Sequence, residues 1–242
     1  MRITIIGSSH GWPEPGRKCT CIMVETGGKV YFVDMGTPVI EELADRGIPV
    51  EAVQGIFITH MHGDHTNGLI PFADLLTWHY KEADPVICLP VIEAADAITA
   101  WIRATLSDHE RKLNYRETRP GAVFDDGTVR MTAVPTRHCD RSYGYVMEAE
   151  GKTVVFTGDF KSPGIDLPVP DRGMHIDLLV GEGAHFNVME YADALDGMDI
   201  GKFCINHYSD DMRLATVLEL RRVLNEKGLP TVLATDGLII EL

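Results

Sequence analysis

Three histidines and one aspartate lie within six residues of one another, in the segment THMHGDH. Imidazole nitrogens and carboxylate oxygens are the ligands that Zn²⁺, Fe²⁺ and Mn²⁺ prefer. His60 and His62 are two residues apart in an extended segment, so their side chains should project to the same side. Gly63 should let the chain turn, so that Asp64 and His65 face the same cavity. The segment predicts a metal site, and a chance cluster on a polar loop is the alternative.

Four side chains cannot complete the coordination shells of two metal ions, so further ligands are expected elsewhere. His138, Asp159 and His207 each come directly after an apolar, strand-like run. Any one of these three could be a surface or capping residue. Together with the first cluster they make seven ligand-type residues, which is enough for a pair of metal ions.

Apolar and β-branched runs predict the strands that must position these side chains. Pro, Gly and helical spacing of apolar residues predict helices over 38–47, 91–106 and 213–227. Hairpin groups followed by helices occur in both halves, which favours two face-to-face sheets with outer helices, as a single domain over 1–242. The expected strands are 2–6, 21–25, 30–34, 55–59, 129–134, 143–149, 152–157, 177–181, 203–206, 231–234 and 238–242.

Composition is that of a globular protein. The 242 residues are 45% hydrophobic and 24% charged, which excludes a disordered chain, a collagen-like repeat and a disulfide scaffold. No run approaches the ~20 apolar residues of a membrane span, and the apolar stretch before Gly7 is too short for a signal peptide. We therefore expect a cytoplasmic protein without membrane association. Cys19 and Cys21 have no second pair at zinc-finger spacing, so they are expected to be reduced and structural.

The formal charge of −14 argues against general binding of polyanions but not against a small phosphate ligand. One stretch, 103–119, is locally basic, with five basic against three acidic residues. A solvated helix face is the favoured interpretation of this stretch. A lid or rim that meets an anionic substrate is the alternative.

Taken in order, these motifs resemble the metallo-β-lactamase superfamily over nearly the whole chain. The residues that carry the resemblance are VDMG (33–36), THMHGDH (59–65), His138, TGD (157–159) and His207. The resemblance implies an α/β (α+β) fold, a four-layer αββα sandwich, which agrees with the pattern of strands and helices. It also implies that Asp34 lies at the floor of the site and is not a ligand.

The resemblance implies two divalent transition-metal ions, with zinc as the first choice and manganese or iron as the alternatives. It divides the seven side chains into one group per ion and one bridging carboxylate. The groups are His60, His62 and His138 for one ion, Asp64, His65 and His207 for the other, and Asp159 as the bridge.

Details within the motif favour one branch of the superfamily. His65 argues against the β-lactamase branch itself, and His62 argues against the redox di-iron branch. The opening segment 7–36 and the closing segments 207–212 and 234–242 resemble the phosphodiesterase branch that includes ribonuclease Z. The long insertion that grips tRNA and the His-x-Ser/Thr segment of that branch are not recognisable. A small anionic substrate is therefore expected, and a large RNA is not.

Two metal ions ~3.5–4 Å apart would generate a bridging hydroxide that attacks phosphorus or a carbonyl carbon. Asp64 could ligate one ion and also orient the nucleophile or accept its proton. His185 is the candidate acid for the leaving group, and a structural histidine is the alternative. Glu182 could orient a ligand histidine through its second ring nitrogen.

The sequence thus predicts a dinuclear metal-dependent hydrolase acting on a phosphodiester of a small or nucleotide-like molecule. A thioester, lactone or ester hydrolase of the glyoxalase-II-like type is the second hypothesis. A mononuclear-iron oxygenase of the persulfide type is the third, and a non-catalytic metal-binding scaffold is the last. The oligomeric state does not follow from the sequence, and a homodimer is one option.

Overall fold

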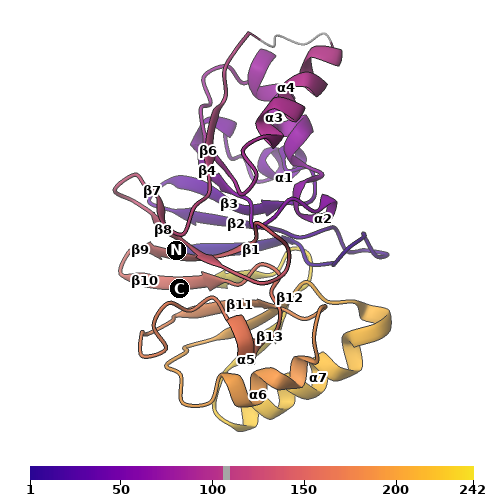
Figure 1. The fold of residues 1–242 in the computed structure, drawn as a ribbon, viewed down its shortest axis with the longest axis vertical. Helices are drawn as coiled ribbons and strands as arrows, with labels where there is room; N and C mark the ends of the chain where they lie inside the picture. Colours follow the sequence, from indigo (N-terminus) through magenta and orange to yellow (C-terminus); the bar gives the residue numbers. More distant parts are fainter. Residues whose placement is uncertain (106–109) are drawn as a thin grey trace.

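Two β-sheets lie against each other at the centre of the molecule, and helices cover the outer face of each sheet (Figure 1). The computed structural model describes residues 1–105 and 110–242. The αββα layers confirm the fold expected from the sequence. Residues 106–109, which include the last position of the helix expected over 91–106 and Asp108 of the basic stretch, lie outside the described residues.

The first sheet is built almost entirely from the N-terminal half of the chain. Its strand order, within the described residues, is β14-β1-β2-β3-β4-β5-β6. The strands are β1 (Arg2–Gly7), β2 (Cys21–Thr26), β3 (Lys29–Met35), β4 (Val53–Phe57), β5 (Val86–Leu89), β6 (Asn114–Glu117) and β14 (Ile239–Glu241). The helices of this half are α1 (Ile40–Asp45), η1 (Val50–Ala52), α2 (Gly63–Thr66), α3 (Leu69–Trp78) and α4 (Ala94–Ala104).

The second sheet has the order β13-β12-β11-β10-β9-β8-β7 within the described residues. The strands are β7 (Gly121–Asp125), β8 (Arg130–Pro135), β9 (Tyr143–Ala149), β10 (Lys152–Phe156), β11 (Leu178–Glu182), β12 (Phe203–Asn206) and β13 (Thr231–Leu233). The helices over this sheet are α5 (Pro163–Asp166), η2 (Val188–Glu190), α6 (Tyr191–Ala194) and α7 (Asp210–Glu226).

The apolar runs of the central strands pack on both faces. In β3, Tyr31 and Val33 face the core between the two sheets, whereas Val30 and Phe32 pack under the helices. Side chains alternate between the faces of a strand, so a strand covered on both sides must be apolar throughout. This alternation explains why the strand runs of the sequence are nearly continuous in hydrophobic residues.

The structure corrects the interpretation of the basic stretch 103–119. Its described part is not one helix face, because α4 ends at Ala104 and β6 begins at Asn114. The guanidinium of Arg111 donates to the backbone carbonyls of Leu76, Tyr80 and Ala83. The last carbonyls of a helix have no partner within the helix, so Arg111 stabilises the end of α3.

The last helix begins slightly earlier than the expected start at residue 213. Helix α7 begins at Asp210 because the Ser209 hydroxyl accepts a hydrogen bond from the Met212 amide, as an N-terminal cap does. Cys19 and Cys21 are free and buried, as expected. Among the described residues, the longest apolar helices fall short of what is needed to cross a membrane.

Candidate metal centre

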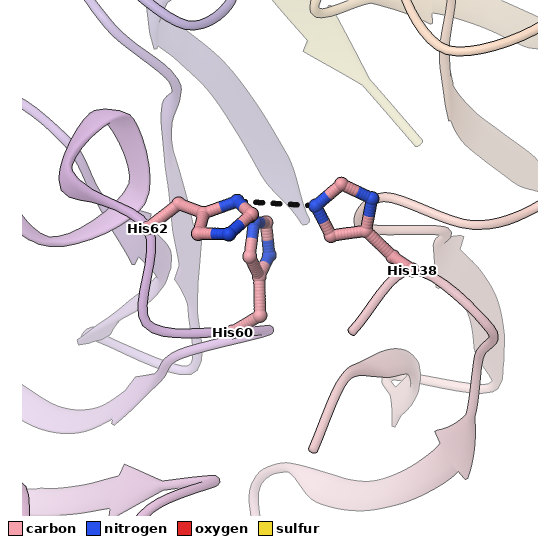
Figure 2. A group of neighbouring side chains, drawn as sticks. All are labelled: His60, His62 and His138. Atoms are coloured by element: carbon pink, nitrogen blue, oxygen red, sulfur yellow. Dashed lines mark hydrogen bonds between the residues drawn. The ribbon is translucent and has the colours of Figure 1, made fainter. Parts of the chain in front are cut away.

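Three histidines from two distant segments face one another at one edge of the sandwich (Figure 2). The Nε2 atom of His60 lies 2.9 Å from Nδ1 of His62, and Nε2 of His138 lies 3.1 Å from the same Nδ1. A zinc–nitrogen bond is about 2.0–2.1 Å long, so nitrogens on one tetrahedral zinc ion lie roughly 3.3 Å apart. The spacing and the chemistry of these donors therefore fit a shared cation.

The chain turns after His62, as expected. Gly63 does not take a positive φ and instead begins the short helix α2. This single turn of helix buries both Asp64 and His65. The expectation that the chain turns here and that both side chains face the same cavity therefore holds, and the turn is the first residue of a helix.

Asp64, His65 and His207 form a second, buried group of donors. The Nε2 atom of His207 lies 3.1 Å from Oδ2 of Asp64 and 3.3 Å from Nε2 of His65. His207 follows β12 and has a φ of 50°, an unusual value for a residue other than glycine. Backbone strain of this kind persists where the surroundings enforce it, often at functional sites.

Asp159 lies between the two groups. Its Oδ2 is 3.6 Å from Nε2 of both His60 and His138, and 3.5 Å from Nε2 of His65. Its Oδ1 is buried and has no hydrogen-bond partner among the described residues. A buried carboxylate with an unsatisfied oxygen is costly unless a positive charge compensates it. The structure therefore brings all seven expected residues together, with Asp159 in contact with both groups.

Asp34 forms a hydrogen bond with the ring of His65. One carboxylate oxygen lies 2.7 Å from Nδ1 of His65, and the other accepts the backbone N–H of Thr59 at 2.8 Å. An acceptor on Nδ1 fixes the tautomer whose free Nε2 faces the cluster. Asp34 has a φ of 57° and is buried. This agrees with its expected place outside the ligand set.

Glu182 contacts His185 more closely than it contacts a metal-ligand candidate. Its carboxylate oxygens lie 3.0 and 3.1 Å from Nδ1 of His185, but the nearest is 4.0 Å from Nδ1 of His207. The hypothesis that Glu182 orients one of the seven ligand candidates is therefore wrong, because Glu182 orients His185 instead. The backbone amides of Phe160, Ala184 and His185 also donate to Glu182, which fixes the carboxylate.

The electrostatic surroundings suit these roles. Burial lowers the pKa of His60 to about 2 and that of His138 to about 4, so both rings are neutral, as metal ligands must be. Burial alone would raise the pKa of Asp159, but its interactions with His207 and His65 outweigh burial and lower that pKa. Burial would lower the pKa of His185, yet Glu182 raises it to about 9.

The connection between β1 and β2 also contacts the ligand candidates, which the sequence did not indicate. The backbone amide of Gly11, in the connection between β1 and β2, donates to Oδ2 of Asp64 at 2.7 Å. The buried ring of His10 lies edge-on to the ring of His207, with 6.2 Å between centroids. Only the Gly- and Pro-rich composition of this connection could have indicated a loop that approaches the site.

Fold and site together define a metal-dependent hydrolase of the metallo-β-lactamase fold, similar to the ribonuclease Z-like branch, with donors suited to divalent metal ions. Within that class, the chain belongs to the family described as Anti-Pycsar protein Apyc1, whose profile matches residues 1–167. The matched part contains all the ligand candidates except His207.

Curated relatives include two bacterial ribonucleases Z. The protein of Mycolicibacterium paratuberculosis is 29% identical over 204 residues, covering 76% of this chain and 68% of the relative. The protein of Listeria innocua is 27% identical over 170 residues, covering 69% of this chain but only 55% of the relative. The chain thus spans between about half and two thirds of the length of these two relatives.

Solved structures share the fold. Human tRNase Z, short form, has a TM-score of 0.77 at 19% identity, with 100% of this chain and 99% of that chain covered. The metallo-beta-lactamase fold protein YhfI from Bacillus subtilis has a TM-score of 0.76 at 18% identity, covering 100% and 98%. At such identities the likeness extends to the fold and not to the substrate.

Proposed function

We propose that this protein hydrolyses a phosphodiester bond in a small, anionic, nucleotide-like molecule, using two divalent metal ions, with zinc as the first choice. The observation that carries the proposal is the position of Asp159 Oδ2, 3.5–3.6 Å from histidine nitrogens of both donor groups. Similarity to ribonucleases Z supports a phosphodiester over a carboxylic ester.

The seven side chains would hold the metal ions in two groups joined by one carboxylate. When bound, a pair of ions lowers the pKa of water and neutralises charge on the phosphoryl oxygens. Both sheets supply ligands, which supports the proposal that residues 1–242 work as one domain. The groups are His60, His62 and His138; Asp64, His65 and His207; and Asp159 with both.

Asp64 would have a second task besides ligation. Its Oδ2 accepts from the Gly11 amide and lies 3.1 Å from His207 Nε2, so the carboxylate is fixed in direction. Burial opposes its ionisation, but His207 and His65 outweigh this and hold the pKa of Asp64 below its usual range. A fixed, ionised carboxylate at this position can orient the attacking water through a hydrogen bond.

His185 would protonate the leaving alkoxide. Glu182 accepts from Nδ1 of the ring, so the proton available for transfer is on Nε2. A pKa of about 9 keeps the ring charged at neutral pH. The side chain is 38% exposed, so a substrate can reach it, and its Nδ1 lies 3.6 Å from Asp159 Oδ2, at the edge of the candidate metal centre.

The test is a pair of phosphodiesters that differ in the leaving group, an alkyl alkoxide and 4-nitrophenolate. His185→Ala should slow the alkyl substrate about 10²- to 10⁴-fold and the aryl substrate far less, because a good leaving group needs no acid. His175→Ala is the matched control. This histidine also has a raised pKa, next to Asp199, but it lies before β11, at the other end of the strand from Glu182.

Several outcomes would contradict the proposal. Equal losses on both substrates would assign His185 to binding or structure, and loss of metal would make it a ligand. His185, Glu182, Asp159 and His207 do offer donor atoms close to one another. Hydrolysis of thioesters or lactones without any turnover of phosphodiesters would favour the glyoxalase-II-like hypothesis. A single bound iron with oxygen consumption would favour the oxygenase.

A further inference from the structure

A small cavity lies between the two sheets, next to the candidate metal centre. Its volume is about 20 Å³, and both sheets line it, for example through Val33 of β3 and Val180 of β11. Three of the ligand candidates, His65, Asp159 and His207, also line it. A single buried water needs about 10–15 Å³ of such volume. The cavity therefore has room for one water molecule and not for a larger ligand.

Three of the residues that line this cavity carry a buried polar atom without a hydrogen-bond partner among the described residues. The atoms are Oδ1 of Asp159, Oδ1 of Asn206 and Nδ1 of His207. The three residues are only 2%, 3% and 4% exposed, respectively. A buried polar atom without a partner is costly in free energy. Their position around one cavity indicates a common partner inside it.

The side chains around the cavity do not satisfy these three atoms directly. Nδ1 of His207 lies 3.4 Å from Oδ1 of Asp159, but the two atoms do not form a hydrogen bond. The nearest oxygen of Glu182 is 4.0 Å from the same Nδ1, which is too far. The amide nitrogen of Asn206 donates to the hydroxyl of Thr20 at 3.3 Å, which leaves its Oδ1 as an acceptor.

His207 differs in this respect from His65. Nε2 of His207 faces the donor group, 3.1 Å from Oδ2 of Asp64 and 3.3 Å from Nε2 of His65. A histidine that binds metal through one nitrogen almost always donates from the other, which fixes its tautomer. Asp34 accepts from Nδ1 of His65 at 2.7 Å. Among the described residues, no group does the same for Nδ1 of His207.

The chemistry of the three atoms matches one water molecule. When Nε2 of His207 faces a metal ion, Nδ1 carries the proton and is a donor, whereas the two Oδ1 atoms of Asp159 and Asn206 are acceptors. Water can accept one hydrogen bond and donate two. A cation in the cavity would face the N–H of His207, and an anion would face the carboxylate of Asp159. The donor and acceptor pattern therefore favours a neutral molecule with two protons to donate.

We propose that this cavity binds one water molecule and that Asn206 is a positioning residue for His207. The water accepts from Nδ1–H of His207 and donates to Oδ1 of both Asp159 and Asn206. It thereby fixes the tautomer in which Nε2 of His207 is free to bind metal. It also connects this ring to Asp159 through the oxygen that does not face the other histidines. The inference rests on the proposed role of His207 as a metal ligand and is independent of the substrate.

The direct test is a high-resolution crystal structure of the wild-type protein, determined with and without zinc. One ordered water should lie about 2.6–3.2 Å from all three atoms in both structures. A cavity without solvent density, a metal ion in the cavity, or a water that contacts only one of the atoms would overturn the inference. If the protein binds no zinc, the proposed function fails, but the structure without zinc still decides the water site.

Asn206→Leu tests the positioning role, because leucine is of similar size and has no acceptor oxygen. Competition with a chromophoric chelator should show about 10-fold weaker binding of the ion held by His207, the lower end of the effect of an outer hydrogen-bond partner. The affinity of the ion held by His138 should not change. In the ¹⁵N spectrum of the zinc-loaded protein, the Nδ1–H signal of His207 should be present in the wild type and lost in the variant.

Thr4→Val is the matched control. The hydroxyl of Thr4 is also buried and has no partner among the described residues, but it lies on β1 and does not line the cavity. Its replacement should change neither the zinc affinities nor the Nδ1–H signal. Unchanged affinity and signal in Asn206→Leu, or equal changes in both variants, would overturn the positioning role.

Discussion

The two halves of the sandwich deliver their metal-ligand candidates in different ways. The first sheet supplies four from a single loop and helix turn after β4, namely His60, His62, Asp64 and His65. The second sheet supplies one side chain from each of three separate strand ends, His138 after β8, Asp159 after β10 and His207 after β12. A compact motif and a dispersed set therefore meet at the same edge.

The strand directions explain why the dispersed set converges. Strands β10, β11 and β12 are parallel neighbours. Strand β8 runs in the same direction, because it pairs antiparallel with β9 and β9 pairs antiparallel with β10. The carboxyl ends of parallel strands lie at one edge of a sheet, where open α/β sheets place ligands. In the second half, the parallel strands bring residues that are distant in the sequence to one edge. In the first half, the ligand candidates are already close in the sequence.

Replacement of Asp159, one of the three ligand candidates from the second sheet, should have the largest effect on metal binding. Asp159→Ala should weaken both metal ions, because this carboxylate contacts both donor groups. The loss of affinity should exceed the roughly 10- to 100-fold expected for an outer hydrogen-bond partner. Competition with a chromophoric chelator measures each affinity. Asp159→Asn keeps the size and is the matched variant, and full occupancy of both ions in either variant would contradict the bridging assignment.

Replacement of Asp34 tests the first sheet's ligand candidates separately, because Asp34 contacts His65. Asp34→Asn would present an N–H to Nδ1 of His65 and favour the wrong tautomer. We expect about 10- to 100-fold weaker binding of the ion held by His65, with the ion held by His138 much less affected. The same chelator titration distinguishes the two ions. Equal weakening of both would show that Asp34 does not act through His65 alone.

The smallest effect is expected at the opposite edge, where Asp126 ties the halves together without touching the site. Its carboxylate accepts from Lys29 Nζ and the Tyr31 hydroxyl, each at 2.8 Å, and from two backbone amides. Asp126→Asn should lower the free energy of unfolding by about 1–2 kcal/mol at pH 7. The metal content should not change.

The pH dependence of this effect has a definite sign. Burial would raise the pKa of Asp126, but the hydrogen bonds outweigh it and lower the pKa to about 2. A carboxyl with a depressed pKa stabilises the fold above the unfolded value of about 3.9, and this contribution is lost as the pH falls toward 2. Urea denaturation from pH 7 to pH 3 should show the gap between wild type and variant narrowing. A constant gap would contradict the ionic role.

Much of the fold and the seven ligand candidates could be predicted, because both leave local signals. The strands before Asp159 and His207 are mostly buried, and β8, before His138, alternates between buried and more exposed residues. In each case a His or Asp comes shortly after the apolar run, which is the local signal. Other elements lack such signals. Strand β6, with the sequence NYRE, lies at the edge of its sheet and is polar, as exposed edges are.

Long-range partners explain the other differences. The basic stretch could not be interpreted correctly because the partners of Arg111 are carbonyls at 76, 80 and 83. Likewise, nothing near Gly11 in the sequence indicates Asp64. Local patterns predict which residues are available for chemistry, whereas the loop that contacts them from outside depends on tertiary structure.

The central claim is that both halves together hold two metal ions. The most direct measurement is elemental analysis of the wild-type protein after metal removal, reconstitution with zinc and extensive dialysis. We expect two tightly bound ions per chain, because the donor groups are distinct and share only Asp159. One tightly bound ion, or none, would contradict it.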